Sequence, residues 1–288
     1  MRLELSLSSH RCFARRDSRS AVFAGLSLAA LVVTPFTRAW AQRTLTVTAR
    51  DTALDAAATV PAGLLNVKLV LKGKARRDLV VRRIPAGLAP EVFAKTAAGR
   101  PERFFQPWSF GGPMAPRDSV SDAIATVDLR PGRYALVSWE VDAAGRARPD
   151  RYLWRSFTAV AASVLIPARF PVADLMVKVR DSRIDVTGNT RTGSRLIQVE
   201  NAGGRPHELI VGRLKPGKTL ADAQHWTREK GEAPFVYIGG LTPISSSVTT
   251  QTRLVLQSGV HVVMCAMRGE HLKAPDNELG VIASFRVN

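Results

Sequence analysis

Three residues in the C-terminal part of the chain carry side chains that ligate transition metals. His207 follows a glycine-containing turn, Cys265 ends a later apolar segment, and His271 comes six residues after the thiol. A cysteine thiolate and two imidazoles can hold copper in a trigonal plane, an arrangement that suits one-electron transfer. The residue types therefore make His207, Cys265 and His271 possible metal ligands.

The same three residues also have structural interpretations. Free cysteine is among the most buried residue types and often behaves as a small apolar side chain, as Cys265 would here. His207 would be a hydrogen-bonded residue at the end of a strand, and His271 would be solvated in a polar loop. On this hypothesis no metal binds.

Motifs of the common enzyme classes do not occur in the 288 residues. A Gly-x-Ser-x-Gly elbow, a His-Glu-x-x-His helix, a phosphate-binding loop and a dinucleotide fingerprint are all missing. We therefore predict that the protein is not an enzyme. Trp108, Trp139 and Trp154 crowd the N-terminal half, where core packing is the first interpretation and a carbohydrate-stacking platform the weaker alternative.

Short segments of alternating apolar and polar residues position these side chains. They recur between Gly, Pro and Asn residues, at positions 45–48, 67–71, 134–137, 176–179, 196–199 and 254–256. A period of two with frequent breakers is typical of strands in an antiparallel sandwich or barrel. The fold class predicted from this pattern is all-β.

The chain aligns with itself at a nearly constant offset of 127 to 130 residues. Five anchors share it: Arg50-Asp51 with Arg180-Asp181, residues 77–81 with 207–211, Gly111-Gly112 with Gly239-Gly240, Gly132-x-Tyr134 with Gly259-x-His261, and Ser156-Phe157 with Ser284-Phe285. We predict two tandem domains, at 43–160 and 174–288, joined by a linker at 161–173. Each has a short helical insertion, at 90–95 in one domain and after the capping box Thr219-x-x-Asp222 in the other.

The second domain resembles the cupredoxins, the plastocyanin-like blue-copper domains. It carries Asn201-x-Gly203-x-x-x-His207 and Gly259-x-His261-x-x-x-Cys265, followed by His271 and a closing strand at 280–287. The resemblance implies two Greek-key β-sandwich domains, and it places His207, Cys265 and His271 where the family's copper ligands stand.

The chain departs from the family pattern at several positions. Five residues separate Cys265 from His271 where the family has two to four, and Val281 stands at the place of the axial methionine. In the first domain Arg77 replaces the histidine and Ser138 replaces the cysteine. We predict that the first domain binds no copper and that the site of the second is largely lost.

The N-terminus resembles a secretory signal. Five arginines precede an apolar run at 21–35, and Ala39-Trp40-Ala41 follows. The run is too short to span a membrane, and the small-x-small sequence predicts cleavage near Ala41/Gln42, with export through either the Sec or the twin-arginine route. We predict a periplasmic or secreted protein with no transmembrane segment in the mature chain.

The net charge of +17 is unusual. Removing residues 1–41 leaves 35 basic and 22 acidic residues, a net charge of +13, of which +9 lies at 42–172. Four arginines flank one strand there and suggest an anion-binding surface: Arg76, Arg77, Arg82 and Arg83. An acidic envelope component or an acidic protein is the expected partner, and nucleic acid is not expected. The alternative is that the basic residues are scattered over a solvated surface and bind no partner.

Together these observations predict an exported, non-enzymatic, cupredoxin-like binding or interaction protein of the cell envelope. The alternative is a single-copper electron-transfer or copper-binding protein that uses the second domain. A carbohydrate-binding module is a weaker alternative. The sequence leaves the oligomeric state open.

Overall fold

The computed structural model describes residues 43–99, 109–116, 122–142, 146–161, 169–269 and 272–288. These residues are mostly in β-strands, as predicted, with two short helices. In chain order the elements are β1 Arg43–Ala49, β2 Leu54–Asp55, β3 Thr59–Pro61, β4 Gly63–Leu71, β5 Arg77–Arg83, α1 Pro90–Gly99, β6 Pro113–Met114, β7 Ala123–Leu129, β8 Gly132–Val141, β9 Ala147–Val160, β10 Leu175–Arg180, β11 Arg183–Gly188, β12 Gly193–Asn201, β13 His207–Leu214, α2 Leu220–Gln224, β14 Phe235–Ile244, β15 Thr249–Leu256, β16 Gly259–Met264 and β17 Ile282–Val287.

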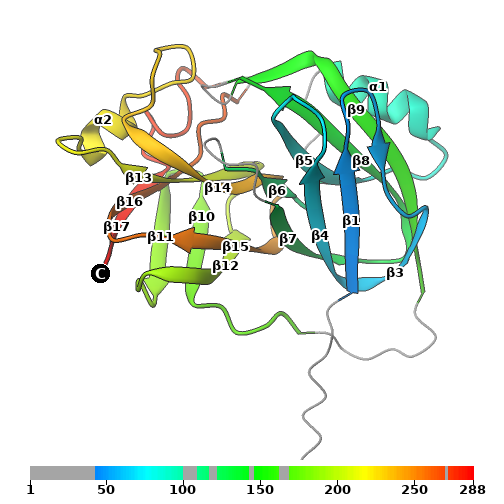
Figure 1. The fold of residues 1–288 in the computed structure, drawn as a ribbon, viewed down its shortest axis with the longest axis horizontal. Helices are drawn as coiled ribbons and strands as arrows, with labels where there is room; N and C mark the ends of the chain where they lie inside the picture. The colour runs from blue at the N-terminus through cyan, green and yellow to red at the C-terminus, as the bar shows by residue number, and fades with distance from the viewer. Residues whose placement is uncertain (1–42, 100–108, 117–121, 143–145, 162–168, 270–271) are drawn as a thin grey trace, which may run out of the picture. The chain divides into compact units, whose positions relative to one another are not determined.

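The strands form two mixed sheets. One has eight strands in the order β11-β10-β12-β15-β7-β4-β1-β2, and the other has nine in the order β17-β16-β13-β14-β6-β5-β8-β9-β3. In each sheet the strands of the N-terminal half (43–160) lie together and those of the C-terminal half (174–288) lie together (Figure 1). The halves join where β15 pairs with β7 and where β14 pairs with β6.

Each half repeats the same strand order. The order β2-β1-β4-β7 corresponds to β11-β10-β12-β15, and β9-β8-β5-β6 corresponds to β17-β16-β13-β14. In the eight-stranded sheet, the first strand of each half runs parallel to one of its neighbours: β1 is parallel to β4, and β10 is parallel to β12. Most other strand pairs are antiparallel. This is a pair of cupredoxin-like β-sandwiches, which confirms the predicted fold class. The exact domain boundaries stay a prediction, because Ala41–Asn288 clusters as one compact unit.

The strand register follows the offset seen in the sequence. Val80 on β5 lies opposite Val137 on β8, and Ile210 on β13 lies opposite Met264 on β16. The two pairs are related by offsets of 130 and 127 residues, the values of the sequence alignment. A slip of one residue would turn every side chain of a strand to the other face, so the repeated register preserves the inward and outward positions of both copies.

Each half has its own apolar core between the two sheets. The core of the N-terminal half contains Leu65, Leu79, Tyr134 and Phe157, and that of the C-terminal half includes Ile197, Leu209, Leu241 and Val263. A stacked ring pair occurs at the same place in both. Tyr134 and Phe157 have centroids 5.4 Å apart at an interplanar angle of 21°, and His261 and Phe285 have centroids 5.3 Å apart at 24°. His261 is therefore a packing residue.

The two helices cover apolar patches on the outer face of the nine-stranded sheet. Phe93 of α1 packs with Val80, Val137 and Trp139, and Ala223 of α2 packs with Ile210 and Met264. The N-terminus of α2 has the expected capping box, in which the Thr219 hydroxyl accepts from the Asp222 N–H and the Asp222 carboxylate accepts from the Thr219 N–H. Both predicted helices are confirmed, and α1 continues to Gly99.

Two equivalent glycines allow close contact at the centre of the nine-stranded sheet. A Cβ on Gly112 would collide with the carbonyl oxygen of Leu79, and a Cβ on Gly240 would collide with that of Leu209. Gly240 also has a φ of +152°. These glycines therefore allow the close backbone packing of the fold.

No helix in the described part of the chain combines the length and apolar composition needed to cross a membrane.

Candidate functional site

His207 is the first residue of β13, and its imidazole is completely buried between two carboxylates. Nδ1 lies 3.1 Å from Oδ2 of Asp276, and Nε2 lies 3.0 Å from Oδ1 of Asp181. A neutral imidazole donates from only one nitrogen, whereas the doubly protonated ring donates to both carboxylates. Neither nitrogen is left free to ligate a metal in this arrangement.

Cys265 follows β16 and is completely buried. Its N–H donates to the Val281 carbonyl at 3.1 Å, which holds the residue in the sheet, and its thiol donates to Oδ2 of Asp276 at 3.2 Å. Burial, with Asp276 and Glu208 nearby, raises the pKa of the thiol well above its ordinary value. Cys265 is therefore a protonated hydrogen-bond donor at physiological pH.

Asp276 is the group on which this cluster converges. Oδ2 accepts from His207 and Cys265, and Oδ1 accepts from the guanidinium of Arg205 at 2.9 Å. Burial acts to raise the pKa of this carboxyl, but the hydrogen bonds from His207, Cys265 and Arg205 outweigh it and lower the pKa below its ordinary value. Asp276 is thus an ionised carboxylate inside the protein.

Asp181 closes the outer side of the cluster. It lies in the turn between β10 and β11, and its carboxylate accepts from the N–H groups of Gly204 and Arg205 as well as from His207. Burial acts to raise its pKa, and the hydrogen bonds from Gly204, His207 and Arg205 lower it overall. The equivalent Asp51 accepts from the Lys74 N–H at 2.7 Å, so the aspartate of the repeated Arg-Asp pair joins the same two turns in both halves.

His207, Cys265 and Asp276 form a group that could hold a metal ion, since one ligand atom from each lies within 4.8 Å of the others. The chemistry of the donors does not fit a copper–thiolate centre. The thiol and Nδ1 both contact the same carboxylate oxygen, and the Arg205 cation lies against the other oxygen. A copper ion would have to displace these protons and lie near a guanidinium. His271, the third predicted ligand, lies outside the described residues.

The equivalent position in the N-terminal half carries a different set of polar contacts. Ser138, which stands in place of Cys265, donates to the Asp78 carbonyl at 2.8 Å. Arg77, which stands in place of His207, is 3% exposed and donates from one terminal nitrogen to the Arg151 carbonyl at 3.1 Å. Burial lowers the pKa of Arg77, opposed by the charges of Glu140 and Asp51.

The four arginines of the proposed anion-binding surface point in different directions. Arg76 is exposed, Arg83 is half-buried, and Arg77 and Arg82 are buried. Arg77 and Arg82 are separated by an odd number of positions on β5, so they lie on opposite faces of the sheet. Burial lowers the pKa of Arg82 to about 9, and its guanidinium lies 5.6 Å from the centre of the Trp139 ring. The structure does not gather the four side chains on one exposed surface.

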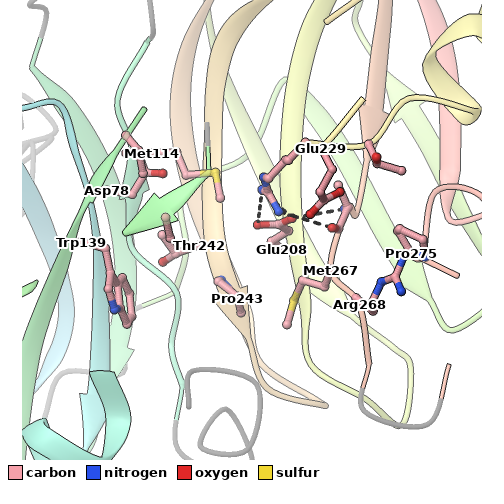
Figure 2. A pocket seen from close by; sticks show the side chains of 15 residues that line it. Asp78, Met114, Trp139, Glu208, Glu229, Thr242, Pro243, Met267, Arg268 and Pro275 are labelled. Atoms are coloured by element: carbon pink, nitrogen blue, oxygen red, sulfur yellow. Dashed lines mark hydrogen bonds and ion pairs between the residues drawn. The ribbon is translucent and has the colours of Figure 1, made fainter. Parts of the chain in front are cut away.

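A pocket of about 300 Å³ lies on the outer face of the nine-stranded sheet, between the two halves. Asp78, Met114 and Trp139 lie on one side of it and Glu208, Met267 and Arg268 on the other (Figure 2). Sequence reasoning missed this pocket and also missed Asp276 and Arg205. Asp181, the second carboxylate that contacts His207, appeared in the sequence analysis only as part of the Arg180-Asp181 anchor of the repeat.

Comparison with protein-family models and with curated proteins finds no match. Among solved structures, auracyanin from Roseiflexus castenholzii is 12% identical over 39% of this chain and 96% of its own, with a TM-score of 0.28. The copper-containing nitrite reductase from Thermus scotoductus is 10% identical over 86% of this chain, with a TM-score of 0.24. A multicopper oxidase from Pediococcus acidilactici is 12% identical over 87% of this chain, with a TM-score of 0.23.

This chain spans 62% of the length of the nitrite reductase and 60% of that of the oxidase. With such low TM-scores and identities, the copper chemistry of those proteins cannot be assigned to this one. The strand order and the parallel pairs β1–β4 and β10–β12 define the fold as cupredoxin-like.

Proposed function

We propose that the protein is an exported, non-enzymatic binding protein of the cell envelope, in which hydrogen bonds within the protein close the copper position of the cupredoxin-like fold. One observation carries this proposal. A single buried carboxylate, Asp276, accepts hydrogen bonds from His207, Cys265 and Arg205. The two groups that would ligate copper are thereby engaged with a negative charge supplied by the protein itself.

Breaking this cluster to admit a metal is unfavourable. Removing one partner of a buried, hydrogen-bonded charge pair costs about 3–5 kcal/mol, because the remaining charge is left without compensation. Copper would have to separate Asp276 from His207 and Cys265 while Arg205 remained beside the carboxylate. The cluster therefore opposes the entry of a metal ion at this position.

The same burial argues against covalent catalysis by Cys265. The thiolate is the nucleophilic form of cysteine, and reactive cysteines have a lowered pKa and access to solvent. Cys265 has a raised pKa and no exposed surface. A binding role agrees with this absence of a reactive thiol, and the predicted export signal and the positive charge favour an envelope location and an acidic partner.

A single-copper protein is the second candidate, and the closeness of the ligand atoms of His207, Cys265 and Asp276 favours it. The carbohydrate-binding alternative has less support. Trp139 is 5% exposed and Trp154 is half-buried, so the described tryptophans do not form an open stacking platform. Trp108 lies outside the described residues.

Titration with Cu(II) separates the first two candidates. The purified protein is treated with a chelator, its metal content is measured, and Cu(II) is then added while the visible spectrum is recorded. We expect no intense copper–thiolate absorption, and the same spectrum from the Cys265→Ser variant. A stoichiometric colour that Cys265→Ser abolishes would establish the copper protein instead. Mass spectrometry of the exported protein tests the location through a new N-terminus near Gln42.

A further inference from the structure

The long strand β9 has an open side at one end of the nine-stranded sheet. β8 pairs with it along one side, whereas on the other side the short strand β3 pairs only with residues 158–160 (Figure 1). Among the described residues, no strand pairs with the outer side of residues 147–157. This open stretch is longer than the edge strands β11 and β17, which have six residues each.

An open strand edge is a binding surface for another strand. Alternate residues of a strand direct their N–H and C=O groups to the same side, so the outer side of β9 presents a row of unpaired donors and acceptors. The sequence agrees with an edge position, because Pro149 has no N–H to donate and proline in a sheet is confined to edges and irregular positions. An extended peptide can therefore add to this side of the sheet.

The side chains beside the open edge alternate in a defined way. Arg155 lies opposite Leu136 of the core, and Leu153 packs against the same core. Arg151 lies 3.6 Å from Glu140 and points to that face as well. Arg151, Leu153 and Arg155 thus share one face of β9, with an apolar residue between two cations.

The two cations are accessible. The side chain of Arg151 is 55% exposed, and its contacts with Glu140 and Asp150 are long, at 3.6 and 4.0 Å. Arg155 is exposed and has no ion-pair partner among the described residues. Opposite charges on directly facing residues stabilise a strand pair, so a strand added here is favoured when it carries carboxylates at these two positions.

A second copy of this chain does not fit the edge. In a symmetric antiparallel pair centred on Leu153, Arg151 of each copy lies directly opposite Arg155 of the other. Like charges at facing positions destabilise a strand pair, and charged edges of this kind prevent a protein from pairing with itself. The same two arginines therefore select an acidic partner and reject a basic one.

We propose that β9 binds an extended acidic segment of a partner protein, which adds to the sheet as a further strand along residues 151–155. The segment carries two carboxylates four residues apart with an apolar residue midway, opposite Arg151, Arg155 and Leu153. Backbone hydrogen bonds supply the affinity, and the alternating side chains supply the specificity. The inference rests on the proposed function, because it gives the acidic partner a chemical class and a position on the fold.

Labelled peptides test the proposal by fluorescence anisotropy with the purified mature protein. The probe is Thr-Thr-Glu-Thr-Val-Thr-Glu-Thr-Thr. One comparison peptide has lysine in place of glutamate, and the other is N-methylated on its five central residues, which keeps the charge and removes the N–H donors. We expect the probe to bind and both comparison peptides to bind at least about tenfold more weakly.

Three outcomes of the peptide experiment would overturn the proposal. One is that the probe does not bind. Another is equal binding of the N-methylated peptide, since charge alone would then explain the interaction. The third is that alginate, an acidic polysaccharide, binds more tightly than the probe and displaces it, which would assign the surface to a glycan.

Variants of the protein locate the binding surface. Arg155→Glu should weaken probe binding about tenfold, which corresponds to about 1.4 kcal/mol, and Arg155→Lys should largely retain it. Arg286→Glu is the matched control, because it makes the same change of charge at an exposed position of the edge strand β17. An equal loss of binding in Arg155→Glu and Arg286→Glu would refute the assignment to β9.

Hydrogen exchange measured by mass spectrometry gives a second, charge-independent readout. The probe should slow exchange of the backbone amides at 147–157 and leave those of β17 unchanged; protection confined to another segment would contradict the proposal. The copper titration is unaffected by these substitutions. A protein that binds neither copper nor the probe would therefore lose this inference and keep the closed copper position of the proposed function.

Discussion

The thiol of Cys265 donates a hydrogen bond across 3.2 Å to Asp276, a carboxylate that is itself completely buried. Cysteine and aspartate occur together at metal centres as two anions that share a cation. Here the thiol keeps its proton, and the positive charge beside the carboxylate is the guanidinium of Arg205. The pair therefore acts as part of the protein core.

Replacing Asp276 by Asn should strongly destabilise the protein. The substitution removes the negative charge that Arg205 and His207 face, and breaking a buried charge cluster costs about 3–5 kcal/mol. Urea unfolding followed by circular dichroism measures the loss. Asp185→Asn is the control, because Asp185 also contacts two arginines but lies at the surface and should have little effect. A change in Asp276→Asn no larger than that of the control would show that the cluster contributes nothing to stability.

Cys265 should be inert to alkylation in the folded protein. Burial and the neighbouring carboxylates raise the pKa of its thiol, so the reactive thiolate is scarce and inaccessible. Mass spectrometry of the peptide that contains Cys265, after iodoacetamide treatment at pH 8, should find it unmodified in the native protein and fully modified in urea. Rapid modification without denaturant would contradict the buried position.

Stability should fall in acid because two carboxylates of the cluster have lowered pKa values in the folded state. For Asp276 and Asp181 the stabilisation is complete above the unfolded-state pKa of about 3.9 and is lost as the pH falls through the lower folded-state values. The melting temperature should therefore be nearly constant from pH 7 to pH 5 and drop below pH 4. The variant Asp181→Asn should lose less of its melting temperature between pH 5 and acid pH than the unmodified protein does. If the two proteins show the same dependence of melting temperature on pH, Asp181 does not contribute to the acid sensitivity.

Gly240→Ala should be far more harmful than Gly217→Ala. Both glycines have positive φ, +152° and +75°, but an added Cβ meets the Leu209 carbonyl only at Gly240 and meets nothing within 4 Å at Gly217. A glycine replacement where φ is positive costs on the order of 1 kcal/mol, and the collision adds to that cost at Gly240. Thermal denaturation of the two variants compares them directly. Equal melting temperatures would show that β14 can move away from the Leu209 carbonyl at little cost, which would contradict the prediction.

The repeat made the fold predictable from the sequence. The offset of 127 to 130 residues recurs in the strand register, and the paired rings at Tyr134–Phe157 and His261–Phe285 occupy the aligned positions. Such features are local patterns that appear twice, so each copy supports the other. The helix after Thr219 was equally visible, because a capping box lies within four consecutive residues.

The polar cluster was only half predictable. His207 and Cys265 stand in recognisable motifs, but Asp276 reaches His207 across 69 residues of sequence and belongs to no motif. The pocket escaped prediction for the same reason, since Trp139 and Glu208 come from different halves. The dispersal of Arg77 and Arg82, in contrast, follows from strand alternation alone.

The two-residue strand β6 pairs with β5 of its own half and with β14 of the other. Side-chain hydrogen bonds reinforce this junction, from Thr242 to the Leu79 carbonyl at 2.9 Å and from the Ser109 N–H to the Ser245 hydroxyl at 3.0 Å. Within the described residues, the two halves therefore form continuous sheets where they meet, because β6 pairs with β14 and β7 pairs with β15. The two halves should consequently unfold together in a single cooperative transition, which differential scanning calorimetry would show as one peak.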